Sequence, residues 1–252
     1  MRVFACLLTV ALAACGPPAR PPPPDAGPDT SCGLDCAAQE HFGLLVNRCF
    51  EYSTSSTASN PAAIGVLVRP VEVLEGGLAV LPVEYRESGQ VKMTDYFTLK
   101  DGNLLLARRS WLPGQSVTYR QEQQGPITGA TWLEAGALAG ENVSSAVQAT
   151  VQGSGAQRTE ATTVRVVLAA ASTSERTVPL KTFDEALQLI LSETPDHGID
   201  TRRVFVANTG FIFFATPFSP AAGATASPYY LQKVRDLDSP DGGTLECGFG
   251  SP

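Results

Sequence analysis

Six cysteines and two histidines are the side chains of this sequence with the greatest chemical reactivity. A thiol can be acylated, bind a metal or form a disulfide, and an imidazole can act as a base near neutral pH. His41 lies in a short polar run between cysteines, and His197 lies in the stretch Pro195–Gly198. Asp196, His197 and Asp200 are close enough in sequence to form a base or metal site. Acidic residues and glycine are more typical of a solvated turn, which is the preferred interpretation.

The sequence contains none of the common catalytic or nucleotide-binding motifs. It lacks G-x-S-x-G, S-x-x-K, H-E-x-x-H, a Walker loop and G-x-G-x-x-G. The acidic segment 236–243 is a poor calcium loop, because Pro240 stands where an oxygen ligand is needed, and we expect a surface turn there. We therefore expect a protein that is not an enzyme and that holds no metal or cofactor.

The first 14 residues have the pattern of an export signal. Met1 and Arg2 form a short positive region, and residues 3–14 form an apolar stretch of 12 residues. A membrane-spanning helix needs about 20 residues, so this stretch is too short to span a bilayer and suits a signal peptide. The leader ends in Leu-Ala-Ala, directly before Cys15.

The segment Leu12–Gly16 resembles the lipobox of bacterial lipoproteins. In that family the cysteine becomes the mature N-terminus and carries acyl chains such as palmitate. The resemblance implies that Cys15 is the site of lipid attachment and that the lipid holds the protein on a membrane. Gly16 follows the cysteine where an aspartate would imply inner-membrane retention, so the outer membrane is the expected location. Ordinary secretion, with cleavage after Ala13, is the alternative.

A proline-rich segment follows the expected anchor. Residues 17–29 contain seven prolines. Because proline fixes φ and lacks an N–H group, we expect an extended spacer, with a docking motif for an aromatic groove as the alternative. The predicted organisation is a signal peptide over 1–14, a lipidated tether over 15–31 and a single disulfide-clasped β-rich domain over 32–252.

Four cysteines remain for the domain once Cys6 leaves with the leader and Cys15 carries the lipid. An even number in an exported chain predicts two disulfides, and a zinc site is disfavoured because the C-x3-C spacing lacks a C-x2-C knuckle. Three connectivities are possible, and each of them links Cys247 to the region 32–49. The two ends of the domain should therefore meet. The four residues are Cys32, Cys36, Cys49 and Cys247.

The chain is acidic, with a formal net charge of −7 and no basic run. Nucleic acids and anionic lipids both require clustered Lys and Arg, so nucleic acid is not an expected partner. The expected partners are a membrane, through the N-terminal lipid, and an envelope protein or a hydrophobic ligand. The pairs Arg108–Arg109 and Arg202–Arg203 place one charge on each face of a strand, and we expect one solvent-facing and one paired arginine in each.

Alternating apolar runs predict a mainly β fold. Residues 78–86, 91–99 and 104–111 are separated by short glycine-containing turns, which indicates an antiparallel meander. Further strands are expected over residues 65–74, 116–121, 127–133, 143–152, 162–170, 202–208, 211–215 and 229–237.

One amphipathic helix is expected late in the chain. Thr182–Glu185 has a capping-box pattern, and Pro195 ends the segment. The predicted fold class is therefore α+β, mainly β, with a large twisted antiparallel sheet, a meander or half-barrel, and this one late helix. The apolar face of the helix would contain Phe183, Ala186, Leu187, Ile190 and Leu191.

The run 211–215 is apolar on both faces, so its sheet should be covered twice. If the sheet wraps as a half-barrel with the helix in or over its mouth, Phe211, Phe213 and Phe214 would line a cavity for an acyl chain. Periplasmic lipoprotein carriers have a similar general architecture, but this sequence shares no motif with them, so the comparison is an analogy. A dry core is the alternative. The leading expectation is therefore an envelope lipoprotein with a non-enzymatic binding or structural role. The first alternative is a carrier or sensor of a hydrophobic ligand, and the second is an envelope hydrolase.

Overall fold

The computed structural model of the protein describes residues 33–57, 61–111, 114–153, 155, 157–199, 201–218, 225–237 and 247, apart from the side chains of Asp35 and Cys36. The described residues belong to one compact unit, Cys32–Pro252. The expected signal peptide, tether and lipid-attachment residue Cys15 lie outside the described residues, as does Cys32.

Strands dominate the described part of the compact unit, and they pair antiparallel throughout. The meander expected from the glycine-containing turns is confirmed, because β4, β5 and β6 pair in sequence order. The strands are β1 (Arg48–Ser53), β2 (Ile64–Val68), β3 (Glu72–Val73), β4 (Ala79–Glu87), β5 (Gln90–Lys100), β6 (Asn103–Ser110), β7 (Ser116–Arg120), β8 (Ala130–Leu133), β9 (Asn142–Gln152), β10 (Arg158–Ala170), β11 (Leu187–Thr194), β12 (Thr201–Val206), β13 (Gly210–Thr216) and β14 (Ser227–Asp236). Two helices accompany them: α1 (Leu34–Phe42) and α2 (Thr173–Arg176).

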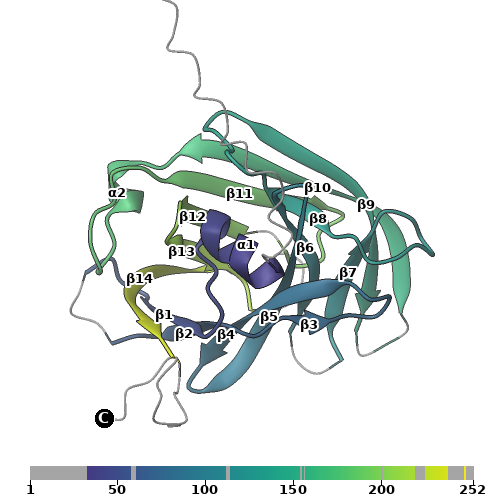
Figure 1. Ribbon diagram of the computed structural model, residues 1–252, viewed down its shortest axis with the longest axis horizontal. Coiled ribbons are helices and arrows are strands. Elements are labelled where there is room, and N and C mark those ends of the chain that lie inside the picture. The colour runs from purple at the N-terminus through teal and green to yellow at the C-terminus, as the bar shows by residue number, and fades with distance from the viewer. Residues whose placement is uncertain are drawn as a thin grey trace, which may run out of the picture. The chain divides into compact units, whose positions relative to one another are not determined.

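The sheet closes into a barrel of twelve strands, as the ring in Figure 1 shows. Its order is β2-β1-β14-β13-β12-β11-β10-β9-β7-β6-β5-β4, and β4 pairs again with β2. Val66 of β2 makes the closure plain, since it lies opposite Phe50 of β1 on one side and Tyr85 of β4 on the other. The expected half-barrel is therefore wrong. Closure leaves no open sheet edge in this ring, which an open half-barrel would have had to protect.

The barrel interior is filled by side chains that alternate along each strand. In β10, Val164, Val166 and Leu168 are buried, whereas Arg165 between them is exposed. In β10 this two-residue period places one face of the strand in the core. The largest fully buried side chain is the indole of Trp132, on β8.

The expected late helix is not confirmed, because residues 187–194 form strand β11. Leu189 and Leu191 are buried and Ile190 is exposed, which is the alternation of a strand. Leu187, Leu189 and Leu191 fit a two-residue period, whereas Leu187, Ile190 and Leu191 fit the 3.6-residue period that suggested a helix, so this short apolar run does not separate the two. Pairing with β10 on one side and β12 on the other decides for the strand. A capping box does occur nearby, at Ser172 and Glu175 of the short helix α2.

The helix that lies within the ring of strands is instead the early one, α1 (Figure 1). It ends at Gly43, whose φ of 66° is left-handed and favours glycine. A Cβ atom at Gly43 would lie 2.6 Å from the backbone nitrogen of Gly210, in the β12–β13 turn. Phe42 packs against Phe205, with ring centroids 6.2 Å apart. The close approach at Gly43 therefore seats α1 at the end of the barrel where β12 meets β13.

A disulfide joins Cys49 of β1 to Cys247, with their Cα atoms 5.5 Å apart. The inference that Cys247 must meet the region 32–49 is thereby confirmed. Both cysteines pack with Leu67 and Leu237, so the bond holds residue 247 beside β1 and β2. The side chain of Cys36 is outside the described residues.

No helix in the described ranges is both long and apolar enough to cross a membrane.

Candidate functional site

An open groove lies beside α1 at one end of the barrel. Its walls come from His41 and Phe42 of α1, from residues 133–139 after β8, from residues 183–187 leading into β11, and from residues 205–207 at the end of β12. We call this site the mouth groove, and its volume is about 730 Å³. Pockets for drug-sized ligands measure about 300–1,000 Å³, so the mouth groove is large enough for such a molecule.

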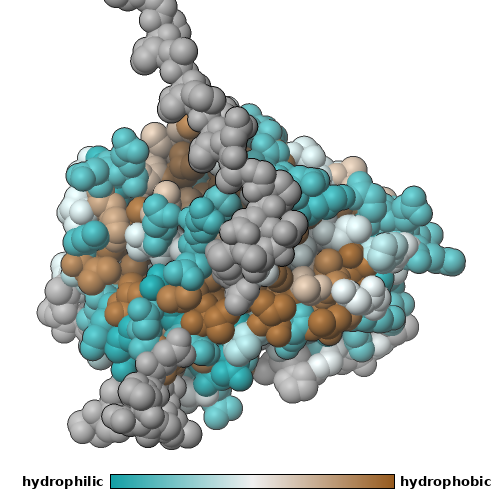
Figure 2. Space-filling model, viewed as in Figure 1, coloured by the Kyte–Doolittle hydropathy of each residue, from teal (hydrophilic) through white to brown (hydrophobic). Residues whose placement is uncertain are grey.

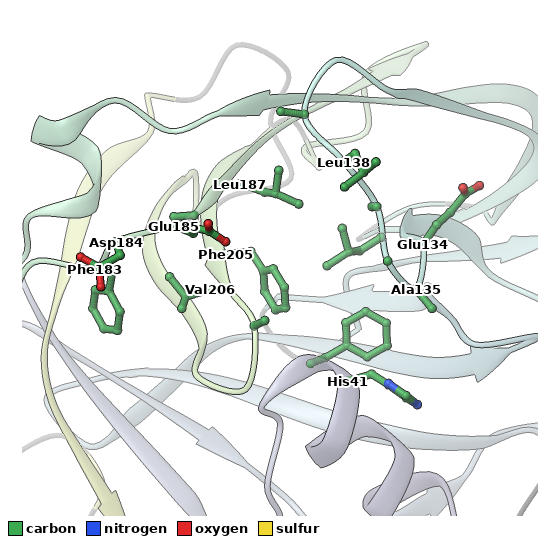
Figure 3. Close-up of a pocket in the computed structure, with 17 residues that line it drawn as sticks. His41, Glu134, Ala135, Leu138, Phe183, Asp184, Glu185, Leu187, Phe205 and Val206 are labelled. Carbon is green, nitrogen blue, oxygen red and sulfur yellow. The ribbon is translucent and has the colours of Figure 1, made fainter. Parts of the chain in front are cut away.

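Apolar side chains form most of the groove. Figure 3 shows Leu138, Leu187 and Phe205 arranged around the same space, on three different segments of the chain. Leu138 is 56% exposed, which is unusual for so large an apolar side chain. Figure 2, seen from the side of Figure 1, shows apolar side chains exposed among hydrophilic ones on this face. Exposed apolar surface in a concave site is typical of a ligand-binding position.

Three carboxylates stand at the rim of the mouth groove. Asp184 and Glu185 lie on one side of it and Glu134 on the other (Figure 3). All three are exposed. Within the described part of the chain, none of them forms a salt bridge and no lysine or arginine lines the groove. The rim is therefore acidic around an apolar interior.

The three phenylalanines expected to line a cavity do not line the mouth groove. Phe211 and Phe214 face the barrel interior, where they and their neighbours leave a space of about 10 Å³. That space is no larger than one water molecule needs, so the interior at this point is packed. Phe213 faces outward and lines a polar pocket of about 580 Å³ with Arg202 and Tyr230.

A buried ion-pair cluster lies in the barrel interior, and none of its residues lines the mouth groove. Asp95 of β5 receives two hydrogen bonds from Arg109 of β6, at 2.5 and 2.9 Å, and one from Arg203 of β12, at 3.0 Å. The Tyr85 hydroxyl donates to the same carboxylate at 3.1 Å. The Arg203 guanidinium lies 4.5 Å from the centroid of the Trp132 indole. All five side chains are almost fully buried.

The charges in this cluster hold Asp95 ionised. Burial acts against the charged carboxylate, but the guanidinium groups of Arg109 and Arg203 outweigh it, so the pKa of Asp95 is lowered. Arg108 and Arg202, the other member of each arginine pair, lie on the outer face, where Arg202 is half exposed and contacts Glu175. The expected division of each pair between the two faces is therefore confirmed.

His197 is buried, so the solvated turn expected for it is wrong. Its Nδ1 lies 2.8 Å from Glu193 Oε1, and its Nε2 lies 2.9 Å from Glu160 Oε1. Glu193 also accepts a hydrogen bond from the Tyr119 hydroxyl at 2.9 Å. Burial acts to lower the pKa of His197, but the two carboxylates outweigh it and raise that pKa. Each ring nitrogen of His197 therefore lies close to a carboxylate oxygen, and both carboxylates favour the charged form of the imidazole.

In the described part of the chain, the side-chain partners of His197 are the two carboxylates. Among the described residues, no serine, threonine or cysteine is hydrogen-bonded to His197, and His197 does not line the mouth groove. Asp196 accepts a hydrogen bond from the backbone of Gly198, and residue 200 is outside the described ranges. In the same ranges, no three His, Cys, Asp or Glu side chains are grouped as metal ligands.

The sequence analysis did not predict two features, the buried cluster around Asp95 and the mouth groove. Asp95 carried a usable signal, since it lies in step with Met93 and Phe97 on the apolar face of its strand. A carboxylate at such a position requires a buried partner, and Arg109 on the next strand of the hairpin supplies it. The mouth groove carried no such signal, because four separate segments build it.

The chain matches no protein-family model, and it has no significant match to a curated protein or to a solved structure.

Proposed function

We propose that this protein is a lipid-anchored envelope protein whose barrel binds a hydrophobic ligand in the mouth groove. The observation that carries the binding function is the groove itself, with a volume of about 730 Å³ and apolar walls from four segments. The groove favours the carrier or sensor over a purely structural role, and it lies at a different place from the cavity expected around Phe211, Phe213 and Phe214. A non-enzymatic role fits the groove better, because none of its described lining residues carries a hydroxyl or thiol nucleophile.

The apolar character of the groove supports a hydrophobic ligand. Phe42, Phe183 and Phe205 are buried beneath its surface, and Leu138 stands exposed at its edge. Removing apolar surface from water contributes about 25 cal/mol per Å², so an apolar ligand gains most by covering the exposed side chain of Leu138. Three buried phenylalanine rings, Phe42, Phe183 and Phe205, line the groove, and a preformed site of this kind binds without a large ordering cost.

The anchor part of the proposal rests on the Leu-Ala-Ala-Cys pattern at residues 12–15. We expect mass spectrometry of the membrane-extracted protein to find an N-terminal peptide that begins at Cys15 and carries a diacylglyceryl group and acyl chains. The matched control is Cys15→Ser, which should yield no acylated peptide and should leave the membrane fraction. An unmodified Cys15 in the wild-type protein would overturn the anchor.

The binding part predicts saturable uptake of a neutral apolar probe. We expect the full chain carrying Cys15→Ser, which can be handled without detergent, to bind N-phenyl-1-naphthylamine with a rise in probe fluorescence. Leu138→Gln should weaken this binding about tenfold, because the probe then loses the apolar leucine surface that it would cover in the groove. Val73→Gln alters another exposed apolar residue, on β3, and should leave the affinity unchanged.

Two results would contradict the binding function. One is the absence of saturable probe binding by the full chain. The other is an equal loss of affinity in Leu138→Gln and Val73→Gln, which would place the probe on the surface at large. Circular dichroism of each variant checks that the barrel is intact.

A further inference from the structure

The rim of the mouth groove carries an unbalanced negative charge. Glu134, Asp184 and Glu185 line the groove, and within the described residues none of them is in a salt bridge. Figure 3 places the carboxylate of Glu185 on the Phe205 side of the apolar space, with Glu134 and Asp184 on opposite sides of it. The remaining titratable lining group is the exposed His41. A ligand in the groove therefore has carboxylates as well as apolar side chains within its surroundings.

Two cationic side chains lie near this rim, and both have other partners. Arg176 donates hydrogen bonds to the backbone carbonyl oxygens of Phe183 and Asp184. The Lys181 ammonium lies 4.6 Å from the centroid of the Phe183 ring. No ion pair joins either cation to Asp184 or Glu185 in the described part of the chain. The carboxylates remain open to a charge supplied from outside.

We infer that the ligand of the mouth groove is a cationic amphiphile, with an apolar tail in the groove and a positively charged headgroup at the rim. The inference rests on the proposed function and names the ligand class for the same site. Apolar walls select the tail, and the carboxylates on both sides of the opening select the sign of the headgroup. The net charge of −7 on the chain adds a longer-range attraction for cations.

The test compares single-chain probes that share one tail and differ in the headgroup. Dodecyltrimethylammonium, 1-dodecanol and dodecyl sulfate, each below its micelle-forming concentration, compete with N-phenyl-1-naphthylamine for the full chain carrying Cys15→Ser. At low salt the expected order of affinity is cation, then alcohol, then anion. At about 0.5 M NaCl the cation should lose most of its advantage over the alcohol, because salt screens exposed charges.

A charge-neutralised rim provides the matched variant. Glu134→Gln, Asp184→Asn and Glu185→Gln together should weaken the cation about tenfold and leave the alcohol unchanged, as expected for a few exposed charge pairs. The control removes three exposed carboxylates that do not line the groove, with the same change of net charge, and should alter neither affinity. Its substitutions are Glu72→Gln, Glu75→Gln and Glu122→Gln.

The outcomes separate the two proposals. If no dodecyl compound displaces the probe and the probe itself does not bind, the proposed function fails. If the alcohol binds as tightly as the cation, or if the cation keeps its advantage in the neutralised rim, the ligand class is wrong while the binding function stands. If the control triple variant loses cation affinity as strongly as the rim variant, the effect belongs to the overall charge and the rim assignment is overturned.

Discussion

Asp95→Asn should lower the free energy of unfolding by about 3–5 kcal/mol, which is the usual cost of removing one partner from a buried ion pair. Asparagine keeps the size of the side chain but removes its charge. Arg109 and Arg203 then remain buried beside Trp132 without a carboxylate to balance them. Urea unfolding, followed by fluorescence and circular dichroism, measures the loss.

Asp236→Asn is the matched control for this substitution. Asp236 forms an ion pair with Arg48 on the surface, and its side chain is 56% exposed. Exposed pairs contribute about 0–1 kcal/mol, so this variant should unfold almost as the wild type does. A similar small effect for Asp95→Asn would show that the buried cluster does not stabilise the barrel.

The effect of Asp95→Asn should depend on pH in a defined direction. The pKa of Asp95 is lowered in the folded protein, so the unfolded chain binds its proton more readily. The stability from this group is therefore fully present above the ordinary carboxyl pKa of about 4 and is lost as the pH falls through the lowered folded value. The difference between wild type and variant should be constant near neutrality and should shrink in strong acid.

Removal of the Cys49–Cys247 disulfide is the second large expected effect. Cys49→Ala with Cys247→Ala should lower the free energy of unfolding by about 5 kcal/mol if the bond acts by restricting the unfolded chain. The reason is the size of the closed loop, since the two cysteines are 198 positions apart. Thermal unfolding of the variant, with and without a reducing agent, measures the change.

Reduction provides the control for the disulfide. The wild type should lose stability when reduced, because the bond that fastens residue 247 beside β1 is broken, whereas the double variant should respond far less. Rapid alkylation of Cys49 in the folded, unreduced wild type would show that its thiol is free and would contradict the bond.

Local pattern was enough to predict most of the strands. The meander of β4, β5 and β6, the doubly buried β13 and the division of each arginine pair between two faces all follow from a two-residue period and from turn residues. These features depend on neighbours a few positions away. The leader, the lipid-attachment residue Cys15 and the tether are also predictions from local pattern, and they lie outside the described residues.

Long-range pairing decided what the local pattern left open. The run 187–191 fits a helix and a strand equally well, and only its place between β10 and β12 makes it β11. Likewise, no short-range signal says that Val66 lies between Phe50 and Tyr85, which is the contact that turns an open sheet into a closed barrel. Hydrogen bonds between distant strands supply this choice, and their free energy exceeds the small differences in local propensity.

The sequence by itself determined that the chain is mainly β and that Cys247 must meet the region 32–49, because strand periodicity and cysteine pairing are readable from residue types alone. The tertiary structure alone decided the closed barrel, the Asp95 cluster and the mouth groove. Each of these joins residues from several distant segments, as Asp95, Arg109 and Arg203 show. Such sites exist only where the fold brings those segments together, and so the candidate function of this protein emerged with the barrel.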